Sequence, residues 1–248
     1  KDAVPEMELE VFGHGAMCIS YSGRCLLSNF LTSRDANRGA CVQACRWAYS
    51  IREVSREQDY PIEEDSHGTY ILNSKDLCMI DYLDKLKQAG VSSVKIEGRM
   101  KTEYYVANVV NAYRKALDYL ATHDEYNLPE EIRAEVYKSS HRDYSTGFFF
   151  GDPKQKLETS LPESTYDFVA VVLEDSVNGK ALVEMRNKFS EKETLELLSK
   201  TKNNAIIKID RIEDLEGNAQ DVCRVPKQQV YLYTQVDLKK NEILRRKK

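Results

Sequence analysis

The period at which apolar side chains recur changes near Pro162, and this change constrains the fold more than any single motif. Before Pro162, segments with the two-residue period of strands alternate with segments that have the 3.6-residue period of helices. That order is typical of a parallel α/β sheet or barrel. Beyond Pro162, short alternating segments follow one another and are separated by turn residues, which favours a small antiparallel β-barrel. We therefore expect two domains, at residues 1–161 and 162–248.

The first domain is expected to hold part of an α/β barrel, because it has too few strand–helix repeats to close one. Its expected strands are at residues 8–12, 69–72 and 92–96, and its expected helices at residues 75–88, 102–122 and 129–139. Asn73 and Ser74 are suitable caps for the first helix, and Gly90 would end it. The charged segment 52–68, which contains Pro61, is predicted to be a loop.

The second domain is expected to consist of short strands. They are predicted at residues 166–173, 180–185, 194–198, 205–209 and 229–236. The chain ends in four basic residues, Arg245 to Lys248. We expect an ordinary solvated tail there, with a contact to nucleic-acid phosphates as the alternative.

Composition limits the possible classes of protein. The chain has 248 residues, of which 42% are hydrophobic and 31% charged, so it can bury a core in each domain. It contains no apolar run of the roughly 18 to 20 residues that span a bilayer and no signal-peptide pattern, so we expect a cytoplasmic protein without membrane contact. The net charge of −4 argues against a globally basic nucleic-acid binder, although a local basic patch stays compatible with it. The oligomeric state is left open.

Five of the six cysteines lie in the first third of the chain. Their spacing is Cys18-x6-Cys25-x15-Cys41-x3-Cys45, followed by Cys78 on the predicted helix 75–88. Converging thiolates are the usual ligands of zinc or of an iron–sulfur cluster, although the paired CxxC motifs of zinc ribbons are absent from this sequence. Buried cysteines without a ligand are the alternative, which we expect for Cys223.

Charged side chains surround the cysteines. Four arginines lie among them: Arg24, Arg34, Arg38 and Arg46. Guanidinium groups bind carboxylates and phosphates in bidentate fashion, so the arginines indicate a site for an anion, with ordinary solvated charges as an equal alternative.

Further polar residues follow two of the predicted strands. His14 follows the first, and Lys95, Glu97 and Arg99 lie at the end of another. Barrel enzymes carry their active sites where strands end, which makes these four residues candidate catalytic groups. A turn histidine and an ion-paired rim are the alternatives without a function.

One long motif resembles the signature of the U32 peptidase family, also called collagenase-like. The motif reads Glu10-x-Phe12-x-x-Gly15-Ala16-Met17-Cys18-x4-Gly23-x-Cys25-x-Leu27-Ser28. The resemblance continues at Arg34-Asp35-x-Asn37-x-Gly39-x-Cys41-x3-Cys45-Arg46, Asn73-Ser74-Lys75-Asp76-Leu77, Lys95-Ile96-Glu97-Gly98-Arg99 and Asn187-Lys188-Phe189. It implies a TIM-like barrel whose first strands precede this sequence, followed by a small β-barrel, so the chain is expected to be a C-terminal fragment.

Within the family, the motifs at residues 74–76 and 95–99 look most like those of the bacterial tRNA hydroxylation proteins. This resemblance implies hydroxylation of the wobble uridine of tRNA to 5-hydroxyuridine, with prephenate as the oxygen donor and a four-iron four-sulfur cluster as the cofactor. The partners would be tRNA and a small anionic co-substrate. The arginines and Lys95 would then position the anion, and Glu97 or His14 would handle protons.

The resemblance leaves the fourth ligand of the metal open. Cys18, Cys25 and Cys41 form the expected set. Cys45 is the favoured fourth ligand because a three-residue spacer lets one turn present two thiolates, and Cys78 is the alternative. Zinc or an empty site are alternatives to the cluster in a fragment.

Two other functions remain open. A peptidase would need an activated nucleophile, but the sequence has no HExxH or GxSxG motif, and a Cys18–His14 dyad would leave the other cysteines unexplained. A fragment that binds RNA or a partner without chemistry is the third possibility.

Overall fold

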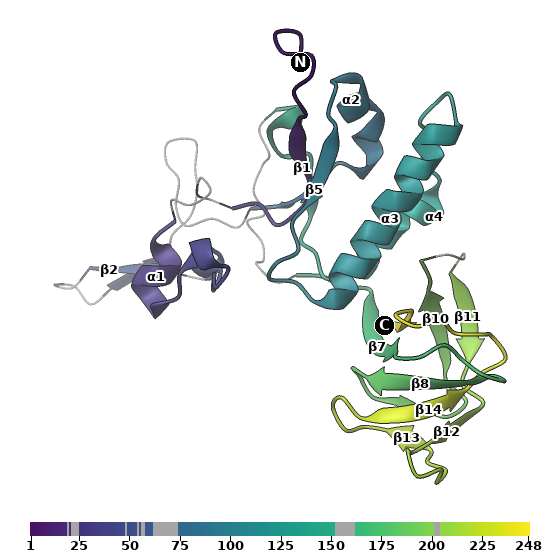
Figure 1. Cartoon of the computed structure of the whole chain (residues 1–248). Coiled ribbons are helices and arrows are strands. Elements are labelled where there is room, and N and C mark those ends of the chain that lie inside the picture. The colour runs from purple at the N-terminus through teal and green to yellow at the C-terminus, as the bar shows by residue number, and fades with distance from the viewer. Residues whose placement is uncertain are drawn as a thin grey trace. The chain divides into compact units, whose positions relative to one another are not determined.

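The structure is a computed structural model that describes residues 1–248 except 19, 21–24, 48, 54, 56–57, 62–73, 152–161 and 201–203. Side chains of residues 37, 46, 50–53 and 58–61 are also outside the description. The chain divides into two compact units: unit 1 is residues 1–136 and 140–163, and unit 2 is residues 137–139 and 164–248 (Figure 1). The division between residues 163 and 164 lies next to Pro162, where the periodicity changes. No helix in the described ranges is long and apolar enough to cross a membrane.

Unit 1 is built on a four-stranded sheet. Its strands are β1 (Glu10–Gly15), β4 (Asp76–Cys78), β5 (Ser93–Ile96) and β6 (Tyr144–Ser145), in the order β5-β1-β4-β6. β1 and β5 are parallel, as the sequence predicts, whereas β4 runs antiparallel to β1. The described strands form a mixed sheet and do not close a barrel. The expected TIM-like barrel therefore stays a prediction.

The predicted long helix of unit 1 is present as α3 (Glu103–Thr122) (Figure 1). Thr102 caps its first turn by accepting a hydrogen bond from the backbone N–H of Tyr105, at 3.2 Å. The apolar stripe of α3 is buried, including Val109, Ala112 and Ala116, and it packs in one cluster with residues of the sheet. Helical turns also cover the predicted segment 129–139, as α4 (Glu130–Arg133) followed by a 3₁₀ turn (Ala134–Lys138).

The prediction of one helix over residues 75–88 is wrong. That segment forms the strand β4, a 3₁₀ turn (Ile80–Tyr82) and only then α2 (Leu83–Gln88). β4 lies between β1 and β6, so pairing with strands distant in sequence overrides the local helical pattern. Cys78 is consequently on a strand, directly opposite His14 of β1.

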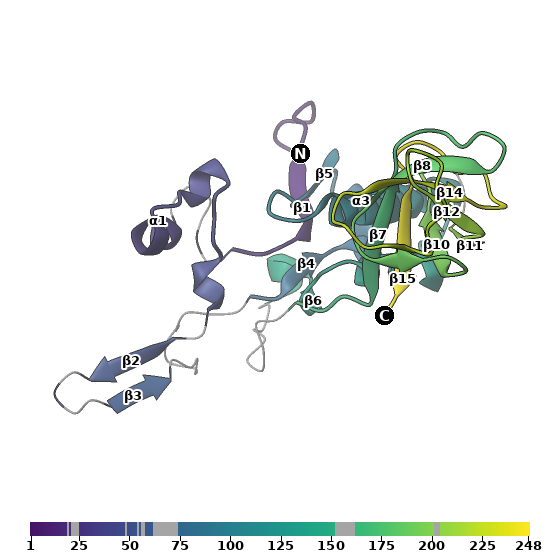
Figure 2. The same ribbon diagram turned by 90° about the horizontal axis from the view of Figure 1, so that it is seen from below.

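The cysteine-bearing segment follows β1 and contains short helical turns. They are α1 (Leu27–Thr32) and two 3₁₀ turns (Ala36–Arg38 and Ala44–Arg46). The loop predicted over residues 52–68 is wrong in part, because β2 (Ser50–Glu53) and β3 (Gln58–Pro61) pair as a hairpin, seen in Figure 2. Residues 54, 56–57 and 62–68 of that loop and the predicted strand 69–72 lie outside the described residues.

Unit 2 is an antiparallel β structure, as predicted. Its seven-stranded sheet has the order β11-β10-β15-β7-β8-β14-β12. The strands are β7 (Tyr166–Val172), β8 (Lys180–Met185), β10 (Thr194–Leu198), β11 (Ala205–Lys208), β12 (Arg211–Glu213), β14 (Gln229–Tyr233) and β15 (Ile243–Lys247). β9 (Phe189–Ser190) pairs with β13 (Val222–Cys223) in a separate ribbon. The sheet curls around its own core (Figure 2), but its end strands β11 and β12 do not pair in the described residues, so it is an incomplete barrel.

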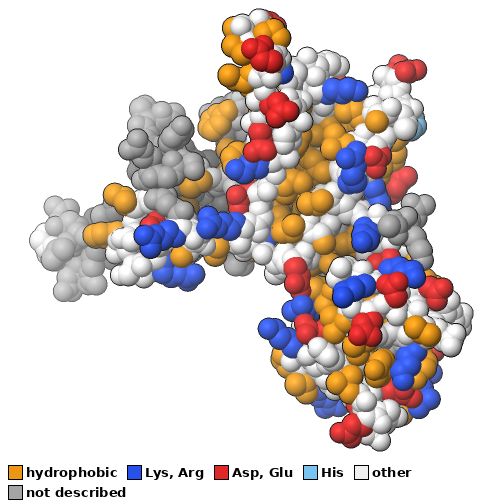
Figure 3. Space-filling model, viewed as in Figure 1, with side chains coloured by type: hydrophobic (Ala, Val, Ile, Leu, Met, Phe, Trp, Pro, Cys, Tyr) orange, Lys and Arg blue, Asp and Glu red, His pale blue; other side chains and the backbone are white. Residues whose placement is uncertain are grey.

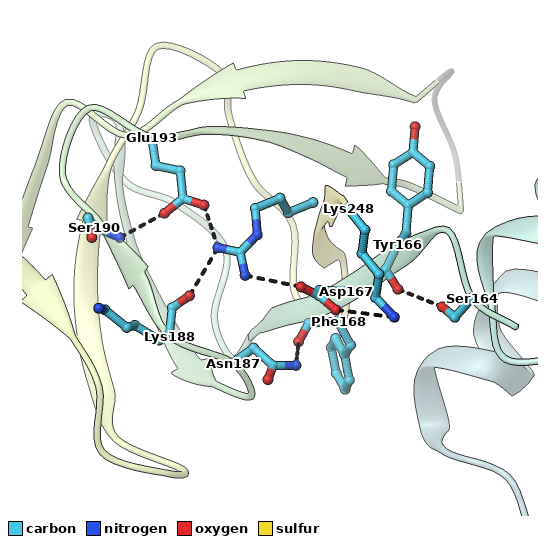
Figure 4. Close-up of polar contacts among 10 residues, drawn as sticks. Ser164, Tyr166, Asp167, Phe168, Asn187, Lys188, Ser190, Glu193 and Lys248 are labelled. Atoms are coloured by element: carbon cyan, nitrogen blue, oxygen red, sulfur yellow. Dashed lines mark hydrogen bonds and ion pairs between the residues drawn. The ribbon is translucent and has the colours of Figure 1, made fainter.

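The prediction of a solvated basic tail is wrong. Residues 243–247 form β15, which lies in the sheet between β10 and β7. The Arg245 side chain is fully buried and forms an ion pair with Glu196. Arg246 donates to Glu193 at 2.6 Å, to Asp167 at 3.2 Å and to the carbonyl oxygen of Lys188. Figure 4 labels these three partners. Both guanidinium groups are thus paired with carboxylates of unit 2.

Candidate metal centre

A cavity of about 850 Å³ in unit 1 brings the ends of β1 and β5 together with the cysteine-bearing segment. Its polar and sulfur-bearing lining residues include His14, Cys18, Cys25, Cys41, Cys45, Glu97, Arg99 and Lys101. Apolar side chains complete the wall, among them Phe12, Met100 and Phe148. Unit 1 presents many apolar side chains on the face drawn in Figure 3. The predicted cysteines thus share one cavity although 27 positions separate Cys18 from Cys45.

In the part of the chain that the structure describes, the four cysteines that line the cavity form no disulfide. Among the described residues, no three histidine, cysteine or acidic side chains are close enough together to hold a metal ion. The sulfur atoms therefore line a common cavity, but they are too far apart to bind one metal ion together. The donor set itself fits a soft metal or an iron–sulfur cluster, because it consists of thiols that come from loops and turns.

Two of the sulfur atoms already accept hydrogen bonds from the backbone. The N–H of Ser20 donates to Cys18 Sγ at 3.4 Å, and the N–H of Gln43 donates to Cys41 Sγ at 3.3 Å. In both cases the donor is the amide two residues further along the chain. Amide donors stabilise a thiolate and tune a metal bound to it, so this arrangement suits ligand cysteines.

Cys78 differs from these four cysteines. It lies on β4 and is not among the residues that line the cavity. Burial raises the pKa of its thiol to about 11, and its Sγ lies 4.0 Å from the Tyr113 hydroxyl. The cavity therefore contains the favoured fourth cysteine, Cys45, and not the alternative.

His14 is completely buried at the end of β1 and held between two tyrosines. Its Nδ1 lies 3.3 Å from the Tyr113 hydroxyl, and its Nε2 lies 3.4 Å from the Tyr144 hydroxyl. Burial, together with nearby positive charge on His141 and Lys101, lowers the pKa of His14 to about 3. The imidazole is neutral near pH 7 and is a poor base.

The candidate residues at the end of β5 differ in their placement, since Lys95 lies within β5 whereas Glu97 and Arg99 follow it. Glu97 and Arg99 line the cavity, and a Glu97 carboxylate oxygen accepts the backbone N–H of Arg99 at 2.9 Å. Arg99 Nη2 donates to the backbone carbonyl of Arg38, also at 2.9 Å. Lys95 is not among the lining residues, and its ammonium lies 4.8 Å from the centre of the Phe12 ring. Of the four candidate catalytic residues, the structure gathers His14, Glu97 and Arg99.

The predicted anion-binding arginines are not gathered in the same way. Arg34 and Arg38 are exposed and do not line the cavity, and Arg38 pairs with Asp35 at 3.7 Å. Arg24 and the side chain of Arg46 lie outside the described residues.

Lys101 is a cavity residue that the sequence analysis missed. It donates to the carbonyl oxygen of Ser140 at 2.9 Å and lies 4.0 Å from the Asp76 carboxylate. Asp76 is buried and also pairs with Arg142 at 3.4 Å, so two cations face one carboxylate beside the cavity. With Arg99, Lys101 gives the cavity lining two cationic side chains, which suits an anionic ligand. In the sequence, the position of Lys101 two residues after Arg99 is the signal that could have predicted its place in the cavity.

Two family models match the chain. Residues 1–159 match peptidase family U32, and residues 164–245 match the C-terminal domain of peptidase family U32. A tRNA hydroxylation protein P1 of Bacillus subtilis is 38% identical over 228 residues, which cover 90% of this chain and 54% of that protein. A tRNA hydroxylation protein P of Escherichia coli is 32% identical over 288 residues, which cover 98% of this chain and 63% of the relative.

A further relative has a different name. A collagenase of Porphyromonas gingivalis is 36% identical over 149 residues, which cover 58% of this chain and 34% of the collagenase. The chain therefore spans between a third and two thirds of the length of these relatives. Since both units match models of the same family, the chain belongs to peptidase family U32.

Proposed function

We propose that this chain is part of a cytoplasmic tRNA-hydroxylating enzyme whose Cys18, Cys25, Cys41 and Cys45 hold a four-iron four-sulfur cluster. The observation that carries the proposal is the cavity in which four cysteine side chains lie beside Glu97, Arg99 and Lys101. The names of the relatives from Bacillus subtilis and Escherichia coli support tRNA hydroxylation as the reaction. Wobble uridine, converted to 5-hydroxyuridine, is the proposed substrate.

The cationic side chains of the cavity are suited to a small dicarboxylate such as prephenate, the proposed oxygen donor. Arg99 and Lys101 reach the cavity from the same turn after β5 and would bind its carboxylates. Glu97 is the carboxylate within the cavity lining that would accept a proton. His14 would act as a neutral hydrogen-bonding group, since its low pKa opposes a charged state. The cluster, when bound, would supply electron transfer or a Lewis-acidic iron.

A peptidase is the second candidate, because the collagenase from Porphyromonas gingivalis aligns with more than half of the chain and Cys18 and His14 line the same cavity. The geometry opposes a Cys18–His14 dyad. Both ring nitrogens of His14 face tyrosine hydroxyls, and Cys18 Sγ accepts from the N–H of Ser20. An imidazole with a pKa of about 3 is also too weak a base to activate a nucleophile near pH 7.

The test is loss of 5-hydroxyuridine from tRNA in cells that lack the gene encoding this chain. Mass spectrometry of wobble nucleosides is expected to show restored 5-hydroxyuridine with the wild-type gene and none with a Cys25→Ser variant. Cys223→Ser is the matched control, because Cys223 is a buried free cysteine of unit 2 and should not affect the modification. Normal modification without the gene, or with Cys25→Ser, would contradict the proposal.

Iron content separates the remaining alternatives. After anaerobic reconstitution, the wild-type chain is expected to hold about four irons. Cys45→Ser should lower this content, whereas Cys78→Ser should not. The opposite result would assign Cys78 as the fourth ligand. Cleavage of gelatin by protein free of metal would favour the peptidase, and tRNA binding without any modification would favour a binding fragment.

A further inference from the structure

The side chain of Arg99, in the turn after β5, binds the backbone of the cysteine-bearing segment. Its guanidinium donates from Nη2 to the carbonyl oxygen of Arg38, at 2.9 Å. Arg38 is the last residue of a 3₁₀ turn, where carbonyl groups lack partners within the turn. A cation at this end of a turn is stabilised both by the hydrogen bond and by the partial negative charge of the carbonyls.

Gly39 leaves space for this guanidinium because it has no side chain. Its φ is +79°, in the left-handed region that favours glycine. A Cβ atom at this position would overlap with Nε and Cζ of Arg99, so the guanidinium lies directly against the Cα of Gly39. The positive φ favours glycine here, and the missing Cβ leaves the space that the Arg99 guanidinium occupies, so a side chain at this position would displace the guanidinium.

The residues held by Arg99 lead directly to Cys41. The N–H of Gly39 donates to the Ala36 carbonyl at 3.0 Å, and the N–H of Ala40 donates to the Asp35 carbonyl at 3.1 Å. On the far side of Cys41, the N–H of Val42 donates to Ser28 Oγ at 3.2 Å. Cys41 thus lies between two points at which its segment is anchored.

The end of β5 also holds the strand that leads to Cys18. The N–H of Glu97 donates to the His14 carbonyl at 2.8 Å. Gly15 has a φ of +128°, and a Cβ atom there would overlap with the carbonyl oxygen of Glu97. The turn from Glu97 to Arg99 therefore contacts both cysteine-bearing stretches of the chain, one by its backbone and one by its guanidinium.

We propose that Arg99 is a positioning residue that clamps the Arg38 carbonyl against Gly39 and thereby holds Cys41 in the same cavity as Cys18. This role differs from the anion-binding role of Arg99 under the proposed function, and its link to metal binding rests on the cysteine centre of that function. The two roles are separable, because a change at Gly39 disturbs the clamp while it keeps the positive charge of Arg99.

Hydrogen exchange of the whole chain tests the clamp directly. In Arg99→Ala and Gly39→Ala, the amides of residues 38–41 are expected to exchange about 10-fold faster, the factor for one charge-assisted hydrogen bond. Arg38→Ala is the control for Arg99→Ala, because the Arg38 side chain is 88% exposed and only its backbone carbonyl accepts the bond. Gly90→Ala is the control for Gly39→Ala, since Gly90 has a φ of +77° and lies away from the cavity.

Anaerobic titration with Co²⁺, read by the thiolate-to-cobalt charge-transfer absorption, tests the consequence for the cysteines. Both clamp variants are expected to bind Co²⁺ about 10-fold more weakly than the wild type, and both controls are expected to bind it equally well. Unchanged exchange in residues 38–41 would overturn the clamp. Faster exchange with unchanged Co²⁺ affinity would overturn its role in positioning Cys41. If the wild-type chain bound neither Co²⁺ nor iron on reconstitution, the cysteine centre of the proposed function would fail, while the exchange data would still decide the clamp.

Discussion

At the scale of single residues, burial decides what the polar groups near the cavity can do. His14 follows a predicted strand and is flanked by glycines, which suggests an accessible catalytic base. The structure instead encloses it between Tyr113 and Tyr144 and lowers its pKa to about 3. A histidine of this kind orients its neighbours more readily than it transfers protons at neutral pH.

The low pKa of His14 predicts how the stability of unit 1 depends on pH. Below about pH 6.5 the unfolded chain binds a proton at His14 that the folded chain excludes, so stability is lost as the pH falls from 6.5 toward 3. Between pH 7.5 and 5, the wild type should lose about 2 kcal/mol more free energy of unfolding than His14→Gln. Urea unfolding at both pH values measures this difference. Equal losses in the two proteins would show that His14 titrates normally in the fold.

At the scale of elements, β4 and β15 show how distant pairing changes local expectations. β4 has only three residues, yet β1 and β6 flank it on either side. β15 contains three consecutive basic residues and still lies between β10 and β7, because Glu196 pairs with buried Arg245. Burial raises the pKa of Glu196, but the bonds from Arg245 and Lys138 outweigh this effect and leave the pKa below its usual value. The carboxylate therefore stays charged, as a buried partner of Arg245 must.

The position of β15 predicts that the last residues of the chain are required for unit 2 to fold. Removal of residues 243–248 would separate β10 from β7 and leave Glu196 without Arg245. We expect unit 2 to lose cooperative unfolding, measured by the circular dichroism of its strands. Removal of Lys248 alone, which contacts Asp167 at 3.7 Å from outside β15, is the control and should leave unfolding nearly unchanged. A stable unit 2 without residues 243–248 would refute the assigned role of β15.

At the scale of the whole molecule, each unit has its own core. One buried cluster contains residues of unit 1, from Leu77 to Val136, and the other contains residues of unit 2, from Val169 to Leu244. The candidate metal centre belongs to unit 1 alone. Metal binding should therefore stabilise one unit and not the other.

The sole tryptophan, Trp47, allows this prediction to be tested, because it follows the turn that contains Cys45 in unit 1. Removal of metal from the loaded chain with a chelator is expected to lower the urea midpoint of the Trp47 fluorescence transition. The urea midpoint of the circular-dichroism transition of the strands of unit 2 should not change. As a control, the chelator should not shift either transition in Cys25→Ser. Equal shifts of both transitions in the wild type would contradict independent units.

The sequence alone determined the features that depend on local spacing. The stripe of α3, the antiparallel strands of unit 2 and the family membership all follow from residues close together along the chain, because periodicity and motifs are local properties. The cysteine spacing likewise indicated a common site, and the four thiols do line one cavity.

Only the tertiary structure decided which residues accompany those thiols. The sequence favoured the arginines near the cysteines, whereas the cavity contains Arg99 and Lys101, which approach from the end of β5. The sequence also predicted that Cys78 lies on a helix, whereas pairing of β4 with β1 places Cys78 on a strand. In each case the outcome depends on contacts between segments far apart in sequence, which local patterns do not encode. Spacing thus singled out cysteines that share one cavity, while packing chose the residues that line this cavity with them.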